Sequence, residues 1–209
     1  MDAQYYGSNC IVLSAKGIRV VVDDNLKELG LKPVTKQADV LLYTATQHAA
    51  PQEARLYVDG PGEYEVSDLS IVGIPARAHM DDPNTRQATM YRVTADSTSY
   101  LFTGHVYPEL NEEQLEAIGM VDVMFVPVGG NGYTLDATGA LQLIKAIEPN
   151  VVIPTHYADP AVHDAVPQQE LEQVLRNLAM EVSETTAKYR FKPQEAGSTT
   201  QLVILTRTS

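Results

Sequence analysis

In the first half of the chain, short apolar runs are separated by turn-forming residues, which is the pattern of β-strands. The runs at 10–14 and 18–22 are apolar and β-branched, and Lys16-Gly17 between them favours a hairpin turn. Residues 25–31 are expected to form a short helix that is capped by Asp24 or Asn25 and ends near Gly30. Further strands are predicted at residues 40–43, 56–58, 63–66, 69–74, 89–94 and 99–102.

In the second half, strands alternate with stretches of helical periodicity. Asn111 is expected to cap a helix that runs through Ile118, and Thr134 is expected to cap a second helix. A third, amphipathic helix is indicated by apolar residues at positions 171, 174, 175 and 178, and strands are predicted at 121–127, 151–154 and 201–206. This order of elements indicates helices packed outside stacked sheets, in a single domain over residues 1–209.

Composition and charge narrow the classes of partner. The chain has 209 residues, of which 44% are hydrophobic and 20% are charged, as in an ordinary globular protein. Its formal net charge of −12 repels phosphate backbones, so we expect no nucleic-acid partner. No apolar run reaches the length of a membrane span, and residues 1–6 lack the pattern of a signal peptide, so we expect no membrane association.

The single cysteine, Cys10, lies in an apolar run and is expected to be a small buried side chain rather than a nucleophile. One cysteine cannot form an internal disulfide, which agrees with a reducing compartment. We therefore expect a soluble cytoplasmic protein.

A series of motifs follows in fixed order between Asp59 and Tyr157. They include a glycine- and proline-rich turn before a strand, a Gly-Gly loop before a helix, and a histidine that follows a strand. In order, they are Asp59-Gly60-Pro61-Gly62-Glu63-Tyr64-Glu65-Val66, Gly73-Ile74-Pro75, Glu113-Gln114-Leu115, Val121-Asp122-Val123, Pro127-Val128-Gly129-Gly130, Gly132-Tyr133-Thr134-Leu135-Asp136-Ala137 and Pro154-Thr155-His156-Tyr157.

In the order and spacing of these motifs, the chain resembles the small metal-dependent hydrolases of the metallo-β-lactamase superfamily, which are distantly similar to ascorbate-6-phosphate lactonase. The resemblance implies an α/β (α+β) fold, the metallo-β-lactamase αββα sandwich, in which helices cover both outer faces of two facing sheets. It also implies a metal site at one edge of the sandwich, with imidazole and carboxylate ligands that hold two metals and activate a water.

The metal-binding signature of that superfamily is largely missing here. The family builds its site from a His-x-His-x-Asp-His loop, a later histidine, a Gly-Asp pair and a final histidine. In the ungapped register, the four ligands of the loop become Ala45, Gln47, Ala49 and Ala50. Sliding the register to use His48 recovers at most one ligand, so the dinuclear site is expected to be absent.

Three other histidines match later positions of the family's site. His79 corresponds to the middle histidine and His156 to the final one. Gly104 keeps the glycine of the Gly-Asp pair, whereas the bridging aspartate is replaced by His105. By resemblance, these histidines would line a cleft together with parts of the loop 129–133.

Two interpretations of these histidines stay open. Three converging imidazoles would form a three-histidine zinc site with an open position. Alternatively, they belong to a polar pocket that holds no metal. Other residues expected to line this pocket are Gly130, Tyr133, Asp136 and Tyr157.

The leading functional interpretation is a pseudoenzyme, meaning a non-catalytic binding or regulatory protein that has a degenerate metal site and needs no cofactor. The first alternative is a divergent hydrolase with one zinc ion at His79, His105 and His156. A third interpretation is a metal-independent enzyme that uses the polar pocket. The expected partner is an unidentified small molecule, and a homo-oligomer is left open.

Overall fold

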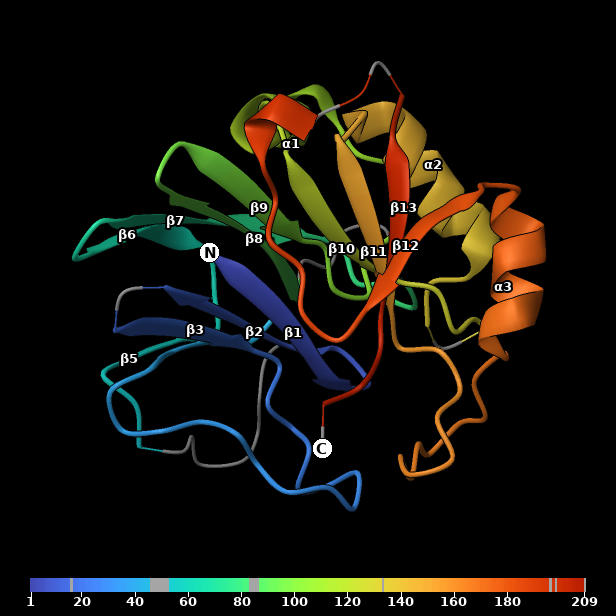
Figure 1. The fold of residues 1–209 in the computed structure, drawn as a ribbon, viewed down its shortest axis with the longest axis horizontal. Coiled ribbons are helices and arrows are strands. Elements are labelled where there is room, and N and C mark those ends of the chain that lie inside the picture. The colour runs from blue at the N-terminus through green and yellow to red at the C-terminus, as the bar shows by residue number, and fades with distance from the viewer. Residues whose placement is uncertain are drawn as a thin grey trace.

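The structure of the protein is a computed structural model that describes residues 1–15, 17–45, 53–82, 87–132, 134–195, 197 and 199–208. Two β-sheets lie face to face within these residues, which confirms the expected fold and its two facing sheets, whereas the helices of the described residues cover one outer face and not both (Figure 1). In sequence order, the strands of the smaller sheet are β1 (Asp2–Gly7), β2 (Cys10–Ala15), β3 (Ile18–Val22), β4 (Val40–Leu42) and β5 (Leu56–Val58).

The smaller sheet has five strands in the order of the sequence. β2 is antiparallel to both β1 and β3, so the predicted pairing of the first two apolar runs is confirmed. β4 then pairs parallel to β3, and β5 pairs parallel to β4. Lys16, which was expected in the hairpin turn, lies outside the described residues.

The larger sheet has eight strands in the order β12-β13-β11-β10-β9-β8-β7-β6. From β6 to β9 each strand is antiparallel to the next, whereas β9, β10, β11, β13 and β12 are parallel. The bounds of these strands are β6 (Gly62–Val66), β7 (Leu69–Ala76), β8 (Ala88–Ala95), β9 (Thr98–Phe102), β10 (Val123–Pro127), β11 (Val151–Thr155), β12 (Val182–Thr186) and β13 (Gln201–Leu205).

The α-helices of the described residues, α1 (Glu112–Ile118), α2 (Ala137–Ile147) and α3 (Leu171–Leu178), lie on the side of the larger sheet that faces away from the smaller one (Figure 1). A short 3₁₀ helix spans Pro193–Glu195. The predicted cap of the first helix is confirmed, since the Asn111 side chain accepts a hydrogen bond from the backbone of Gln114. None of the helices in the described ranges is long and apolar enough to cross a membrane.

The predicted cap of α2 is wrong. Asp136, not Thr134, occupies the N-cap, and its Oδ1 accepts a 2.8 Å hydrogen bond from the backbone of Gly139. The Thr134 hydroxyl instead donates to the carbonyl oxygen of Gly130 at 2.6 Å. Threonine and aspartate are both good N-cap residues. Asp136 takes the position because the Thr134 hydroxyl is already bonded to Gly130.

The main core lies between the two sheets, where buried side chains of β2 and β3 such as Leu13 and Val20 face those of the larger sheet. Phe102 of β9 and Phe125 of β10 stack with ring centroids 4.7 Å apart. A second cluster lies on the other face of the smaller sheet and includes Val12, among other buried side chains.

The outer face of the smaller sheet is covered by the segment 25–35, in which the predicted helix at residues 25–31 does not form. The segment is a succession of turns that carries Leu26, 1% exposed, onto the sheet. The backbone N–H of Leu31 turns back to the carbonyl oxygen of Leu26, and Gly30 between them has a left-handed φ of 82°. Asp24 Oδ2, directly before the segment, accepts hydrogen bonds from the backbones of Val34 and Thr35 near its end. These bonds hold the two ends of the segment together.

The C-terminal part of the chain lies along the free edge of β1. Ala3 and Tyr189 exchange two backbone hydrogen bonds of 2.7 and 3.0 Å, and Tyr5 forms a bridge with Arg207. Thr208 also donates its backbone N–H to the carbonyl oxygen of Tyr5. The edge strand of the smaller sheet is therefore paired on both sides over part of its length.

Candidate functional site

The strand directions bring the three predicted histidines to one edge of the larger sheet. β7 and β9 run in the same direction because each is antiparallel to β8, and β11 is parallel to β9 through β10. His79, His105 and His156 each follow the C-terminal end of one of these strands. Strands that point the same way end at the same edge, so the loops that carry the histidines meet there.

His105 and His156 are in direct contact. His105 Nε2 lies 2.6 Å from His156 Nδ1, and the ring centroids are 4.6 Å apart. The other ring nitrogen of His156, Nε2, lies 3.2 Å from Oδ1 of Asp164. A neutral imidazole carries one N–H and one acceptor nitrogen, so Asp164, His156 and His105 form a chain of hydrogen bonds that fixes both rings.

The backbone at His156 is itself constrained. His156 has a left-handed φ of 53°, and its N–H donates a 2.7 Å hydrogen bond to the carbonyl oxygen of Ser8. A non-glycine residue adopts this conformation only when its surroundings hold it there. The position of the His156 ring is therefore determined by the smaller sheet as well as by its own strand.

His79 joins this pair through the backbone. Its N–H donates to the carbonyl oxygen of His105 at 2.8 Å, and the neighbouring residues Ala78 and Val106 form a β-bridge. The Nδ1 atoms of His79 and His105 are both buried, and neither forms a hydrogen bond with the described residues. Two imidazole nitrogens are thus withdrawn from water at this place.

Burial also determines the charge state of His105. It lowers the pKa of His105 well below the ordinary value, and the neighbouring His156 and His79 rings lower it further. A protonated imidazole is unfavourable here because the charge would lose its hydration and face other imidazoles. His105 is therefore neutral near pH 7.

A buried carboxylate network adjoins the histidines and was not anticipated from the sequence. Asp23, directly after β3, accepts 2.7 Å hydrogen bonds from both the backbone N–H and the hydroxyl of Thr44. Asn9 donates to Asp23 at 3.3 Å and accepts a 2.6 Å hydrogen bond from the Thr155 hydroxyl. Burial raises the pKa of Asp23 to about 6, although the hydrogen bonds from Thr44 oppose the shift.

This network connects the ends of β3, β4 and β11. Gly104, the retained glycine, packs against Thr44: a Cβ on Gly104 would lie 2.5 Å from the threonine Cβ and Oγ1. Its φ of 60° also lies in the left-handed region that glycine tolerates. In the sequence, Asp23 is recognisable only as an aspartate that ends an apolar run, and Asp164 only as an aspartate next to His163. Neither feature indicates which residue is the partner.

The remaining predicted pocket residues have different surroundings. Gly130 precedes α2, and Asp136 caps that helix. Tyr157 is buried, with its ring beside Tyr5 and its hydroxyl donating to the carbonyl oxygen of Leu205 at 3.1 Å. Tyr133 lies outside the described residues.

Gly129, in the same loop, approaches His156 so closely that a Cβ there would overlap the His156 carbonyl oxygen. Of the degenerate ligand loop, the structure describes Ala45, which forms a bridge with Ala88, whereas Gln47, His48, Ala49 and Ala50 lie outside the described residues. Within the described part of the chain, no group of three or more His, Cys, Asp or Glu side chains is arranged to hold a metal ion. The histidines therefore meet, but they do not surround a common point.

The chain is similar to known proteins over most of its length. The sequence model of the family described as "Beta-lactamase superfamily domain" matches residues 2–156. A metal-dependent hydrolase from Thermoplasma acidophilum is 44% identical over 48 residues, a stretch that covers 22% of this chain. The chain matches only 21% of the length of that curated relative.

Two solved structures have the same fold. A protein of Thermotoga maritima, described as a zinc-dependent hydrolase of the metallo-β-lactamase superfamily, superposes with a TM-score of 0.74 at 21% identity and covers 98% of each chain. A metallo-hydrolase of the archaeon Ignicoccus hospitalis superposes with a TM-score of 0.60 at 16% identity, covering 91% of this chain and 99% of its own. Because the family match spans well over half of the 209 residues and the fold agrees, the chain belongs to the metallo-β-lactamase superfamily.

Proposed function

We propose that this chain is a pseudoenzyme, a binding protein that keeps the hydrolase fold and has lost the dinuclear metal centre. The observation that carries the proposal is the contact between His105 Nε2 and His156 Nδ1 at 2.6 Å. His105 stands where the family has its bridging aspartate. This contact occupies two ring nitrogens, His105 Nε2 and His156 Nδ1, that would otherwise be available to a metal.

The chemistry of the two side chains supports this conclusion. A carboxylate bridges two metals because it offers two oxygens, whereas each nitrogen of an imidazole has at most one lone pair. Two nitrogens bound to one tetrahedral zinc at bonds of about 2.0–2.1 Å lie roughly 3.3 Å apart. At 2.6 Å, His105 and His156 instead share a proton in a hydrogen bond.

The loop that precedes this site agrees with the proposal. Ala45, Ala49 and Ala50 offer no donor atom at three ligand positions of the family. Thr44, at the start of the loop, uses its hydroxyl and N–H to bind Asp23. The polar groups that remain near the histidines therefore hold the strand ends and loops to one another.

A second candidate is a hydrolase with a single metal at His79, His105 and His156. The unpartnered, buried Nδ1 atoms of His79 and His105 favour it, because neutral imidazole nitrogens are good ligands for zinc. In the arrangement described above these three side chains do not fit a metal, since the contact between His105 and His156 would first have to open. We therefore rank this candidate second and derive no reaction from it.

Metal content distinguishes the two candidates. The chain would be produced without a histidine tag, dialysed against zinc or manganese and then against buffer, and analysed for metal per chain. We expect well below one metal ion per chain and no hydrolysis of bis(p-nitrophenyl) phosphate or of a simple lactone. Two metals per chain together with hydrolysis would refute the proposal.

Matched variants identify the site if a metal is found. His105→Ala and His156→Ala remove the central pair, whereas His163→Ala removes an exposed histidine outside it. One metal per chain that disappears in the first two variants and persists in His163→Ala would establish the second candidate. Equal metal content in all of them would assign the metal to a site unrelated to these histidines and leave the pseudoenzyme proposal standing.

A further inference from the structure

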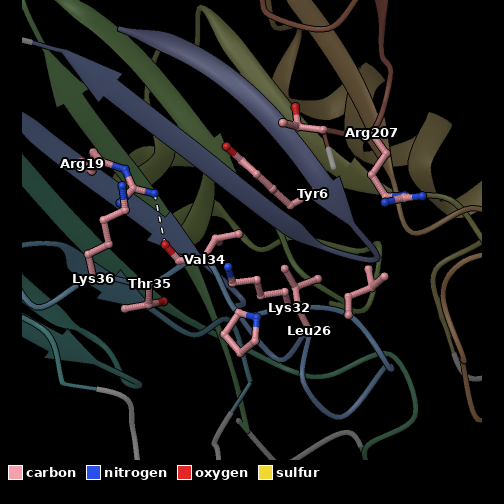
Figure 2. Close-up of a pocket in the computed structure, with 11 residues that line it drawn as sticks. Tyr6, Arg19, Leu26, Lys32, Val34, Thr35, Lys36 and Arg207 are labelled. Carbon is pink, nitrogen blue, oxygen red and sulfur yellow. Dashed lines mark hydrogen bonds between the residues drawn. The ribbon is translucent and has the colours of Figure 1, made fainter.

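A cavity of about 470 Å³ lies on the outer face of the smaller sheet, between β1, β3, the turn segment 25–35 and the C-terminal residues (Figure 2). In this view, Arg19 and Arg207 lie on opposite sides of the cavity, with Tyr6 between them. None of the three clustered histidines lines it. The cavity is therefore separate from the candidate site described above.

The charge of this cavity is opposite to that of the protein. Four of its lining residues, Arg19, Lys32, Lys36 and Arg207, are cationic, and none is acidic. The whole chain carries 27 acidic and 15 basic residues, with a formal net charge of −12. A concentration of cations on an acidic protein attracts a small anion to this place in particular.

The two arginines are held in position by aspartates outside the lining. Arg19 donates to Asp39 at 2.8 Å and to the carbonyl oxygen of Val34 at 3.2 Å, the contact drawn in Figure 2. Arg207 Nε donates to Asp159 at 2.5 Å. A guanidinium has five N–H donors, so each arginine keeps donors for a ligand while its orientation is fixed.

The two lysines supply the uncompensated charge. Lys32 and Lys36 are exposed at the mouth of the cavity, and neither forms an ion pair within the described ranges. Arg19 and Arg207 are paired with Asp39 and Asp159, and Asp24 accepts hydrogen bonds from Val34 and Thr35 of the lining. The four cations therefore exceed the neighbouring aspartates by one positive charge. A ligand with one carboxylate or phosphate matches this excess.

The rest of the lining is apolar apart from Thr35, Thr208 and the hydroxyl of Tyr6. Leu26, Leu31 and Val34 belong to the second hydrophobic cluster and give the cavity an apolar wall, together with the ring of Tyr6. The hydroxyl oxygen of Thr208 is buried and forms no hydrogen bond with the described residues.

We propose that this cavity binds a small organic anion that has an apolar, ring-sized body and a single carboxylate or phosphate group. The anionic group lies on the Arg19 side of the cavity, with Lys32 and Lys36, and the body packs against Leu26 and its apolar neighbours toward Arg207. A pocket of a few hundred cubic ångströms with an apolar wall and a few polar groups is typical of sites for such molecules. The assignment is independent of whether the histidines bind metal.

Calorimetric titration of the full chain with four probes tests the assignment. Phenyl phosphate and phenylacetate carry the ring with the two candidate anionic groups, phenol carries the ring alone, and inorganic phosphate carries the charge alone. We expect saturable binding of at least one of the first two and at least tenfold weaker binding of phenol and of inorganic phosphate, because both parts of the ligand are recognised. The tighter of the two anions identifies the class of ligand, and rising salt weakens its binding.

Charge-reversed variants locate the binding. Lys32→Glu/Lys36→Glu is expected to lower the affinity for the tighter-binding anion by a factor on the order of tenfold or more, since charge-assisted hydrogen bonds of about 1.5–3 kcal/mol are lost. Lys145→Glu/Arg176→Glu makes the same change of charge on exposed residues of α2 and α3 and is expected to leave the affinity within about twofold. Melting curves of both variants confirm that they are folded.

Three results would overturn the assignment. The first is that neither aromatic anion binds, and the second is that phenol or inorganic phosphate binds as tightly as they do. The third is an equal loss of affinity in the two charge-reversed variants, which would mean that net charge rather than this cavity determines binding.

Discussion

Asp23 accepts two hydrogen bonds from Thr44, one from the backbone N–H and one from the hydroxyl, each 2.7 Å long. The two residues follow adjacent parallel strands, so this pair ties the ends of β3 and β4 together directly beside the first residues of the degenerate loop. The carboxyl group is buried, and its pKa is raised to about 6 from an ordinary value of 3.8. The pair therefore has a measurable pH dependence.

The first prediction follows from the sign of that shift. A carboxyl group with a raised pKa in the folded state favours folding when protonated, so its contribution is present below about pH 4 and is lost as the pH rises through about 6. Relative to Asp23→Asn, the free energy of unfolding of the parent should fall by about 2.5 kcal/mol between pH 4 and pH 7. Urea unfolding of both chains across this range measures the difference. Parallel curves would show that Asp23 titrates normally.

The second prediction concerns the fit of Gly104 against Thr44. Gly104→Ala combines a left-handed φ of 60° with a Cβ that would lie 2.5 Å from Thr44, so we expect a loss of about 2–4 kcal/mol in the free energy of unfolding. Gly17→Ala provides the control, because Gly17 has a φ of 83° with open space around it. It should cost only about 1 kcal/mol. Equal losses would show that the contact with Thr44 relaxes without cost.

The third prediction is that the metal site can be rebuilt. The fold supplies the strand ends, whereas the side chains at these ends determine which ligands are present. We expect a variant with the family's ligands to retain zinc or manganese after dialysis, in contrast to the parent, although hydrolysis also requires supporting residues that have changed. The variant combines Ala45→His, Gln47→His, Ala49→Asp, Ala50→His and His105→Asp.

A control for this variant is the same four loop substitutions without His105→Asp. It should bind metal less well, because the contact between His105 and His156 persists. A folded five-fold variant that remains as free of metal as the parent would show that the ungapped register of the loop is wrong.

The fourth prediction concerns removal of metal. Ligation normally stabilises the loops of such a site, so chelation lowers the melting temperature of a metal-dependent fold. We expect EDTA to shift the melting temperature of the parent chain by less than about 1 °C. A drop of several degrees that added zinc reverses would favour the single-metal candidate. The rebuilt variant, measured in the same way, should be sensitive to EDTA.

The sequence predicted most of the architecture because most strands are apolar runs between strong turn signals. Two strands were not predicted. β1 alternates regularly between buried and half-exposed positions, but its buried positions are Ala3, Tyr5 and Gly7, which are small or only weakly apolar and give little hydrophobic signal. β12 is composed of Val182 followed by polar residues and is an edge strand, so burial gives it little hydrophobic signal.

The site was predictable to a similar degree. The order of the motifs identified His79, His105 and His156, and the strand directions bring them together. The contact between two of them and the hydrogen bond to Asp164 depend on side-chain packing across loops, which no local pattern encodes. The cationic cavity was missed for the same reason, because its charges come from residues 19, 32, 36 and 207 and meet only in the fold.

The pairing of β1 with the end of the chain has a consequence for solubility. An open edge strand offers unpaired N–H and carbonyl groups to the edges of other molecules and so promotes aggregation. Here Tyr189, Arg207 and Thr208 occupy part of the edge that Ala3 and Tyr5 would otherwise present. These contacts thus protect the edge of β1 against intermolecular sheet formation. Thr208→Pro, which removes the N–H donated to Tyr5 and leaves β13 intact, should aggregate during refolding at concentrations at which the parent chain stays in solution.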